Sequence, residues 1–425
     1  MEHAVKKNLI LFITGKTTAV LGSSIFSFTI GLYILAQTGS SLNFAITLLL
    51  GILPRVVLSP IAGALSDRLD RKKIIIFSDF ACAVWLGVIL LIFTFITDGI
   101  WVLYVSTLIL TVLNVFYSSA VLSSVHNTVG PDNIQKAMSL NQAAVSLSNI
   151  LGPVLGGLLF GFVPLSTFIA INMFTFLISA TASVFIQYNL FAEDRGEEEK
   201  TSMFTDLKLG LNYVKTQPFI KQLIIIAMWI NFWFAVFPIA MPYLIMTVRH
   251  MTSTQFGIIE GSFSVGFMLM AIFMSTRPEM KRKDIGILGG VAGLSIILIL
   301  IGLPSMGAFQ DLSNNFIFIY LISLVFILSL LMMIVNMPIG VLMQKHVPDQ
   351  YRGRVNSLLE AGSTAMMPIG YILFGGLLEK IPVWLLVSIC GISILALMIY
   401  HIWKGTFVKQ LQTMEKQIIS PAIEG

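Results

Sequence analysis

Long runs of apolar residues, separated by short polar or Gly/Pro-containing segments, make up most of the chain. A run of about 20 apolar residues is long enough to cross a bilayer as a helix. Such runs have to be helical, because lipid offers no hydrogen bonds to an irregular backbone. The pattern predicts an all-α membrane protein with twelve transmembrane helices, at about residues 9–35, 43–63, 74–96, 101–124, 137–162, 165–188, 220–247, 255–276, 285–307, 315–343, 355–378 and 382–403.

Composition excludes a water-soluble or disordered chain. Hydrophobic residues make up 56% of the 425 residues and charged residues 11%, against roughly 45–50% and about 25% in soluble domains. The net charge is +5, but the basic residues lie in short clusters between apolar runs. This arrangement is typical of cytoplasmic loops and not of a nucleic-acid-binding face. We expect a protein of the lipid bilayer that binds no nucleic acid.

The distribution of Lys and Arg predicts the orientation in the membrane. When the N-terminus is placed on the cytoplasmic side, most of the 26 Lys and Arg residues fall in cytoplasmic segments. Basic residues favour the cytoplasmic side of spanning helices. We therefore expect a multi-pass protein of the cell membrane with both termini in the cytoplasm.

The longest polar segment, residues 190–219, divides the spans into six plus six. It opens with the charge run Glu193–Lys200, after which apolar residues recur at helical spacing at Phe204, Leu207, Leu211 and Val214. This spacing predicts an amphipathic helix on the inner membrane surface, or else a solvated linker with one weak helix. The predicted parts are an N-terminal six-helix bundle (1–189), the linker (190–219), a C-terminal six-helix bundle (220–404) and a cytoplasmic tail (405–425).

The two halves resemble each other. Pro131-Asp132 precedes the fifth span and Pro348-Asp349 the eleventh, and Gly156-Gly157 and Gly375-Gly376 come late in the same two spans. In both cases the matching residues of the two halves are separated by about half the chain length. This constant separation indicates a duplicated six-helix unit. Parallel repeats of this kind are typical of transporters that rock two pseudo-symmetric bundles around a site at the bilayer midplane.

The loop between the second and third spans, Gly63–Lys73, resembles the signature loop of the major facilitator superfamily, in which an aspartate follows a glycine by four residues and precedes a basic cluster. Asp70 departs from the family, which commonly has glycine there. Glycine permits close packing, aspartate can face a helix N-terminus, and the basic residues can hold the loop against the anionic leaflet. The resemblance implies a conformational role for Gly63, Asp67, Arg68, Arg71 and Lys72.

The fifth span carries Gly152-Pro153-Val154-Leu155-Gly156-Gly157, which is similar to a stretch typical of drug antiporters in this superfamily. Glycines let helices approach closely, and proline permits a bend. We expect Gly152, Pro153, Gly156 and Gly157 to form a moving contact between the bundles. Ser148 stands where the family usually has a further glycine.

Four further stretches, Gln37–Ser41, Gly51–Pro54, Leu69–Lys73 and Met366–Gly370, resemble bacterial macrolide-efflux-type facilitators. The resemblance covers most of the chain and implies proton-driven export of amphiphilic compounds. The family often has an arginine in the middle of the fourth span, where Thr111 and Asn114 stand here. Proton coupling therefore has to use other groups.

Charged side chains inside a span are costly and are functional candidates by default. Four stand out: Lys16, Arg55, Glu260 and Glu360. The family fold places the second and eleventh spans side by side, which suggests an Arg55–Glu360 ion pair that closes the cytoplasmic side. Each of the two could instead reach a water-filled cavity alone. Glu260 and Glu360 are the candidates for proton coupling, although Glu260 could be a structural, hydrogen-bonded carboxyl.

The family fold also implies that the first, fourth, seventh and tenth spans line a central cavity. Lys16 either lines this cavity or extends along the helix to the inner interface. Aromatic and Met surfaces with few polar groups suit large amphiphilic ligands, although packing or lipid contact would explain each residue as well. The cavity candidates are Lys16, Ser23, Ser27, Asn114, Tyr117, Trp229, Asn231, Phe234, Met332 and Asn336.

The sequence does not indicate nucleotide binding, metal binding or catalysis. Gly15-Lys16-Thr17 resembles the end of a phosphate-binding loop, but that motif requires glycine where Ile10 stands. The five histidines lack metal-ligand spacing, and no hydrolase or kinase motif occurs. We predict a non-enzymatic, monomeric transporter without cofactor or metal that exports a small amphiphilic substrate against protons. The alternatives are import of a small solute, flipping of a lipid-like molecule, or a receptor or scaffold on the same fold.

Overall fold

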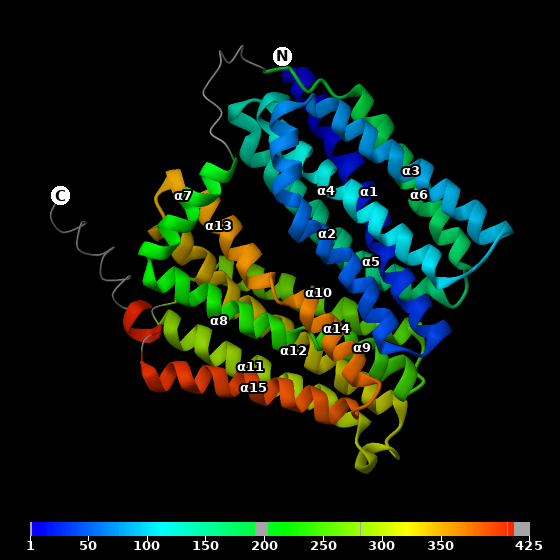
Figure 1. Cartoon of the computed structure of the whole chain (residues 1–425), viewed down its shortest axis with the longest axis vertical. Helices are drawn as coiled ribbons and strands as arrows, with labels where there is room; N and C mark the ends of the chain where they lie inside the picture. The colour runs from blue at the N-terminus through cyan, green and yellow to red at the C-terminus, as the bar shows by residue number, and fades with distance from the viewer. Residues whose placement is uncertain (1, 192–202, 281, 406, 412–425) are drawn as a thin grey trace. The chain divides into compact units, whose positions relative to one another are not determined.

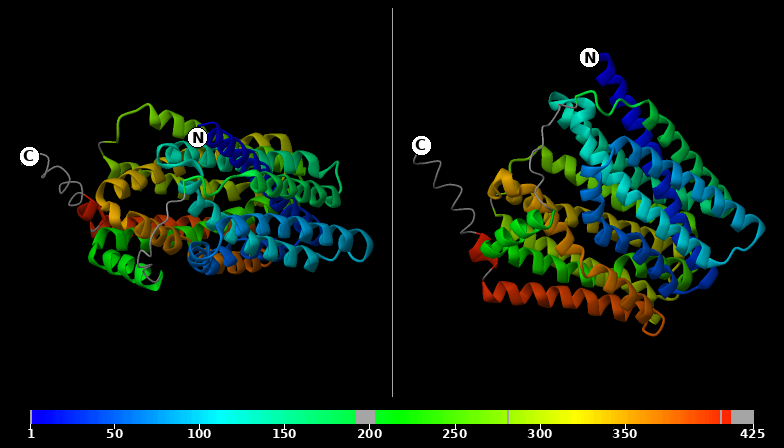
Figure 2. Two further views of the ribbon diagram at one scale, coloured as in Figure 1. Left: turned by 90° about the horizontal axis from the view of Figure 1, so that it is seen from above. Right: turned by 45° about the horizontal axis from the view of Figure 1, so that its top comes forward.

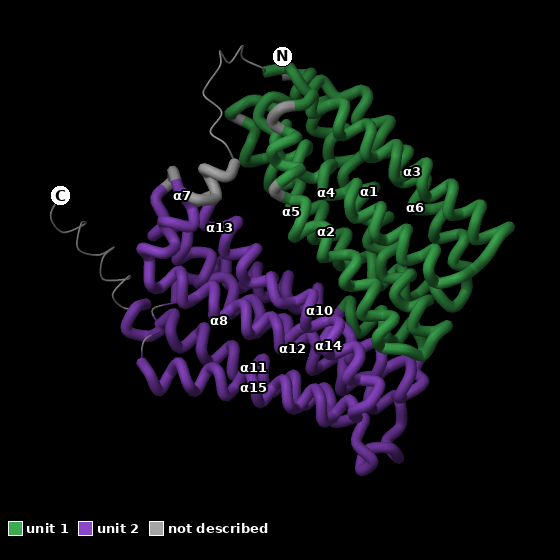
Figure 3. The backbone as a smooth tube through the Cα atoms, in the orientation of Figure 1, with its two compact units in different colours: residues 1–200, 252–261 green, residues 201–251, 262–425 purple. Residues whose placement is uncertain are grey.

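In the computed structural model of the chain, residues 2–191, 203–280, 282–405 and 407–411 are described, and none of them lies in a β-strand (Figure 1). The chain divides into two compact units (Figure 3). Unit 1 comprises residues 1–200 and 252–261, and unit 2 comprises residues 201–251 and 262–425. The first turns of one helix, α10 (Ser253–Ser275), therefore group with unit 1 and the remainder with unit 2.

Besides the first turns of α10, the described part of unit 1 consists of six long helices and one short 3-10 turn. Gly39, with φ +62°, adopts the left-handed conformation and ends the first helix. The Ser40 side chain accepts a hydrogen bond from the backbone N–H of Asn43 and so caps the next helix. The elements are α1 (Glu2–Thr38), α2 (Ser41–Arg68), α3 (Arg71–Phe95), α4 (Ile100–Val129), η1 (Pro131–Asn133), α5 (Ile134–Phe160) and α6 (Leu165–Phe185).

Unit 2 contains more elements because two of its spans are interrupted. Its helices are α7 (Met203–Thr216), α8 (Pro218–Phe234), α9 (Phe237–Pro242), the π-helical turn η2 (Tyr243–Val248), most of α10, α11 (Lys283–Gly302), the 3-10 turns η3 (Leu303–Ser305) and η4 (Gly307–Phe309), α12 (Asn314–His346), α13 (Asp349–Thr364), α14 (Met367–Leu378) and α15 (Val383–Lys404).

Among the described residues, twelve helical segments are long and apolar enough to cross a membrane, which confirms the predicted number of spans. The seventh span is built from α8, α9 and η2, and the eleventh from α13 and α14. Proline explains both interruptions, because it has no N–H and clashes with the preceding turn of a helix. Pro238 and Pro242 lie in the first of these spans, and Pro368 in the second.

The two units repeat the same helix pairings. In unit 1, α1 packs on α5 and α6, and α3 packs on α4 and α6. In unit 2 the corresponding helices pair in the same way, α8 with α13 and α15, and α11 with α12 and α15. Figures 1 and 2 show α11 and α15 running side by side. The core of unit 1 is filled by large apolar side chains, among them Phe168, Phe176 and Leu86.

A short helix, α7, forms in the polar segment between the halves and packs on α8 and α13 of unit 2. The Tyr213 ring stacks on the Tyr351 ring of α13, with the ring centres 4.6 Å apart, and Val214 is buried while Leu211 is exposed. One face of α7 therefore packs against α8 and α13 of unit 2. Its position on the inner membrane surface stays a prediction. The charge run Glu193–Lys200 and the side chains of Phe204 and Leu207 lie outside the described residues.

Candidate substrate and coupling sites

The loop between α2 and α3 is held by hydrogen bonds to the helices of unit 1. The Asp70 carboxylate accepts hydrogen bonds from the backbone amides of Lys72 and Lys73 and caps α3. Asp70, which departs from the family pattern, therefore has a local role that glycine cannot fill, because only a side-chain oxygen can accept these amides. The Arg71 guanidinium donates to the Ser66 carbonyl at 3.2 Å and to the Ser123 carbonyl of α4 at 2.9 Å.

Lys72 extends the same pattern to α6. Its ammonium donates to the carbonyls of Val184 and Ile186, at 2.9 and 3.2 Å, at the C-terminal end of that helix. A cation at this position also interacts favourably with the helix dipole. Arg71 and Lys72 thus bind backbone carbonyls, whereas the Lys73 side chain is exposed and remains available for the lipid surface.

The structure does not test the conformational role predicted for Gly63, Asp67 and Arg68 of the signature loop. A Cβ added to Gly63 would meet only the Ser119 hydroxyl, at 3.9 Å, so packing in this structure does not require glycine there. The side chains of Asp67 and Arg68 lie outside the described residues. Their conformational role stays a prediction.

The glycines of α5 lie where this helix approaches α1. A Cβ on Gly152 would lie 2.6 Å from the Ser24 Cβ, and one on Gly156 would lie 2.9 Å from a ring carbon of Phe28. Real Cβ atoms do not approach other atoms this closely, so glycine is needed at both positions. Pro153 lies inside α5 between them. Ser148, where the family usually has glycine, is buried.

Gly157 approaches a different helix. A Cβ at this position would lie 2.7 Å from the Gly257 Cα and 2.7 Å from the Ser253 carbonyl oxygen, both in the first turns of α10. The obstacle is backbone, which cannot move aside as a flexible side chain can. The Thr254 hydroxyl completes this contact by donating to the Gly157 carbonyl at 3.5 Å.

Lys16 is buried inside unit 1, with 8% of its surface exposed. Its ammonium lies over the ring of Tyr117 on α4, 4.7 Å from the ring centre, in a cation–π contact. Extension to the inner interface is therefore wrong, because the side chain ends within the bundle. Tyr117 is also buried. A cavity-lining role for these two residues stays a prediction.

Asp79 on α3 is a fifth charged residue within a span, and the candidates predicted from the sequence do not include it. Asp79 is 1% exposed, and its Oδ2 accepts a hydrogen bond of 2.6 Å from the Ser179 hydroxyl of α6. It also interacts electrostatically with Lys16. The rule that selected Lys16 and Glu260 applies equally to an aspartate within the run 74–96, so the sequence did contain a sufficient signal.

The other charged candidates are less constrained. Glu260 on α10 is partly buried and has no hydrogen bond or ion pair with any residue that the structure describes, which does not favour the structural alternative. Arg55 and Glu360 are exposed within their own units. They belong to units that are described separately, so their pairing stays a prediction.

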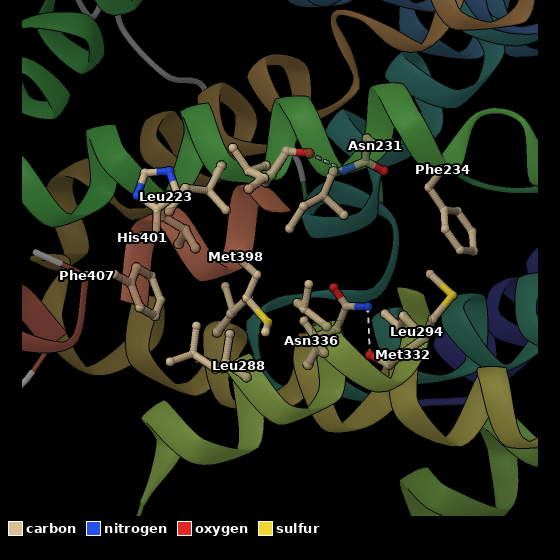
Figure 4. A pocket seen from close by; sticks show the side chains of 18 residues that line it. Leu223, Asn231, Phe234, Leu288, Leu294, Met332, Asn336, Met398, His401 and Phe407 are labelled. Carbon is tan, nitrogen blue, oxygen red and sulfur yellow. Dashed lines mark hydrogen bonds between the residues drawn. The ribbon is translucent and has the colours of Figure 1, made fainter. Parts of the chain in front are cut away.

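Unit 2 contains a cavity of about 140 Å³ between α8, α11, α12 and α15 (Figure 4). Its walls are apolar except for two amides and one imidazole. Four of the five candidates predicted in this half line it, namely Asn231, Phe234, Met332 and Asn336. Trp229, the fifth, is absent from the cavity wall and packs edge-to-face against Phe232, with ring centres 5.8 Å apart.

The two asparagines present their amides to the cavity in the same way. Asn231 donates to the Ala227 carbonyl and Asn336 to the Met332 carbonyl, each at 2.9 Å, four residues back on its own helix (Figure 4). No other described residue forms a hydrogen bond with either amide. One N–H and the carbonyl oxygen of each therefore remain for a ligand.

Four further wall residues come from or follow α15, a helix that the family resemblance does not assign to the cavity. They are Leu397, Met398, His401 and Phe407. His401 Nδ1 is paired with the Gln222 amide nitrogen at 3.2 Å. No sequence pattern distinguishes these residues from lipid-facing ones, because their position depends on how α15 packs on α8 and α11.

The polar candidates of unit 1 have ordinary helical environments. The Asn114 amide donates to the Leu110 carbonyl at 2.9 Å, Ser23 is partly buried and Ser27 is exposed. In the part of the chain that the structure describes, no group of three or more His, Cys, Asp or Glu side chains lies together in a way that could hold a metal ion.

Comparison with known proteins identifies the class. The sequence profile described as Major Facilitator Superfamily matches residues 12–371. The chain therefore belongs to the major facilitator superfamily, a family of transporters and not a class of enzymes, and is a multi-pass membrane protein.

Individual relatives are distant but match along nearly the whole chain. Macrolide efflux protein A of Streptococcus pyogenes is 24% identical over 401 residues, covering 92% of this chain and 95% of that protein. Multidrug efflux pump Tap of Mycolicibacterium fortuitum is 23% identical, with 89% and 91% covered. The crystal structure of a bacterial homologue of the iron transporter ferroportin in an inward-facing state shares the fold, with a TM-score of 0.66, 15% identity, and 96% and 99% covered.

Proposed function

We propose that this protein exports amphiphilic compounds, macrolides among them, in exchange for protons by alternating access. Two whole-chain relatives that are named as efflux proteins support export. The glycines of α5 let this helix approach α1 and the first turns of α10 closely, and we expect movement of helices at this contact. We further propose that both termini lie in the cytoplasm, that the protein acts as a monomer, and that it catalyses no reaction.

The cavity of unit 2 is the observation that supports an amphiphilic substrate. Apolar side chains form most of its wall, and only Asn231, Asn336 and His401 offer polar atoms. Such a wall suits the hydrophobic part of a molecule that also carries hydrogen-bonding groups. Sites for drug-sized ligands occupy at least about 300 Å³, so this cavity would hold one ring or chain of a large amphiphile.

For proton coupling, Glu260 and Glu360 remain candidates from the sequence. A carboxyl that moves between protein and water during transport can take up a proton on one side and release it on the other. Glu260 has the more suitable environment, since it is partly buried and lacks partners among the described residues.

The proposal is tested by expressing the full chain in an efflux-deficient bacterium and measuring accumulation of ethidium and of a macrolide. Export predicts lower accumulation than in cells without the protein, and a protonophore should abolish the difference. Asn231→Ala and Asn336→Ala should each reduce export about fivefold, since one hydrogen bond contributes about 1 kcal/mol. Ile319→Ala, on the same helix as Asn336 but 65% exposed, is the control.

The alternatives give different results in this assay. Import would raise accumulation above that of control cells. A receptor or scaffold would leave accumulation of every compound unchanged. Export that resists the protonophore would reject proton coupling while leaving the substrate class in place.

A further inference from the structure

A buried acid and a buried base face each other inside unit 1. Asp79 of α3 and Lys16 of α1 are 1% and 8% exposed, so neither has free access to water. The Ser179 hydroxyl of α6 donates to Asp79 Oδ2 at 2.6 Å, and the Lys16 ammonium lies 4.7 Å from the centre of the Tyr117 ring. We call Asp79, Lys16, Tyr117 and Ser179 the Asp79 cluster.

The hydrogen bonds of the cluster are incomplete. No described residue donates a hydrogen bond to Asp79 Oδ1, although this oxygen is fully buried. Lys16 and Asp79 interact electrostatically, but the ammonium lies over the tyrosine ring and forms no direct ion pair with the carboxylate in the described structure. An ionised carboxylate offers about four acceptor sites, and this one has a single donor. A proton on Oδ1 would remove the buried charge that this single donor leaves poorly compensated.

Four other titratable groups interact with members of the cluster or belong to it. Arg55 of α2 interacts electrostatically with Lys16, and Cys82 of α3 and Tyr188, which follows α6, interact with Asp79. Tyr117 contributes the remaining titratable group, from α4. Asp79 is thus the one acid among these neighbours, and Lys16 is the cation that acts on it.

We propose that Asp79 is a proton-binding site and that Lys16 is the cation balanced by its ionised carboxylate. Binding of a proton forms an O–H bond at Oδ1 and leaves Lys16 without a balancing charge. A buried, unbalanced cation is costly at membrane depth. Proton binding therefore favours a conformation in which Lys16 reaches water or an anionic group, which links the proton to movement of unit 1.

The role of this site in transport rests on the proton-driven export proposed above. The site itself does not, because proton binding at Asp79 can be observed without substrate. Asp79 also differs from Glu260 in having a fixed hydroxyl donor and a facing cation, so its protonation changes the energy of a defined partner.

The direct test is infrared difference spectroscopy of the full chain in liposomes, comparing acidic with alkaline pH. The wild type should show the carbonyl band of a protonated, buried carboxyl, and Asp79→Asn should lose it. Ser179→Ala should shift its frequency, because the donor to Oδ2 is removed. Asp284→Asn is the control, since Asp284 is also buried but is paired with Arg282 at 3.1 Å.

A transport measurement on the same liposomes separates the two proposals. With a pH gradient imposed, Asp79→Asn should lose uphill accumulation of ethidium and retain downhill exchange. If the wild type lacks gradient-driven transport but Asp79→Asn loses the infrared band, the proton site stands and proton-driven export fails. If Asp79→Asn is not recovered folded, Asp79→Glu should keep a shifted band. A spectrum unchanged by substitution of Asp79 would overturn the inference.

Discussion

Gly157 of α5 and Gly257 of α10 are in backbone contact, close enough that a Cβ on Gly157 would lie 2.7 Å from the Gly257 Cα. The repeat within the chain provides the matching position in the other half, Gly376 of α14. A Cβ on Gly376 would meet no atom within 4 Å. One glycine of the repeated pair is thus required by packing, and its counterpart is not.

Gly157→Ala is expected to destabilise the protein by about 1–3 kcal/mol, the usual cost of forcing an extra group into a packed contact. Gly376→Ala should be neutral or more stable by up to about 1 kcal/mol, because alanine favours a helix over glycine. Thermal unfolding of both purified variants in detergent measures the difference. Equal stability of the two would show that the contact between α5 and α10 is not maintained.

Lys72→Met is expected to destabilise unit 1 by about 1 kcal/mol. The substitution keeps the apolar stem but removes the ammonium that binds the carbonyls of Val184 and Ile186 at the end of α6. Lys73→Met is the matched control, because the neighbouring lysine is exposed and no side-chain bond of it appears in the described structure. The free energy of unfolding, measured with a denaturant, should fall for Lys72→Met alone.

The loop between α10 and α11 should respond to acid. Glu279 forms ion pairs with Lys345 of α12 and, at 3.6 Å, with Lys283 of α11. The hydrogen bond from Lys345, followed by the charges of both lysines, lowers the pKa of Glu279 below its ordinary value. A lowered pKa means that the stabilisation is present at neutral pH and is lost as the pH falls through the pKa of the folded state.

We therefore expect Lys345→Met to cost less than about 1 kcal/mol at neutral pH, since the pair is exposed. The difference from the wild type should vanish once the pH falls well below the ordinary glutamate value of about 4.3. It should also shrink in high salt, which screens exposed charges. The free energy of unfolding of the two proteins, measured across pH and salt concentration, tests both expectations. If the difference in this free energy persists at low pH, Lys345 acts through another contact.

Ala227→Phe should abolish export of ethidium and leave the fold intact. Ala227 lines the cavity of unit 2, so a phenyl group at this position would occupy the space that we assign to the substrate. Ile225→Phe, on the same helix at a position that is 42% exposed and not part of the wall, should transport normally. Loss of transport in both variants, or in neither, would remove the cavity from the proposed mechanism.

The number of spans and the breaks in two of them follow from local chemistry. Twelve apolar runs of spanning length predict twelve helices, and Pro238, Pro242 and Pro368 lie where helices are interrupted. The helices extend several residues beyond the apolar runs, because polar residues such as Asp70 cap them. The family motif singled out the α5 glycines, of which Gly152 and Gly156 lie against α1 in the same unit. The moving contact between the bundles that was expected of them stays a prediction.

The candidate sites were predicted less completely. Asn231, Phe234, Met332 and Asn336 share one cavity wall, but this cavity lies within unit 2. Their place in a central cavity shared by both halves stays a prediction. His401 of α15 and Phe407, which follows that helix, complete the wall, and no pattern in the sequence pointed to them. Lys16 was identified as a charged residue in a span, but its two proposed surroundings, lipid interface and open cavity, did not include a buried aspartate.

Sequence alone determined that this chain spans a bilayer twelve times and belongs with two-bundle transporters, because apolar length and proline position act within one helix. Tertiary structure alone decided which polar groups meet. Asp79 and Ser179 are 100 residues apart in the chain and 2.6 Å apart in space, and Lys16 reaches the ring of Tyr117 from another helix. Such contacts depend on the rotation and depth of each helix within its bundle, which are set by packing against several neighbours at once.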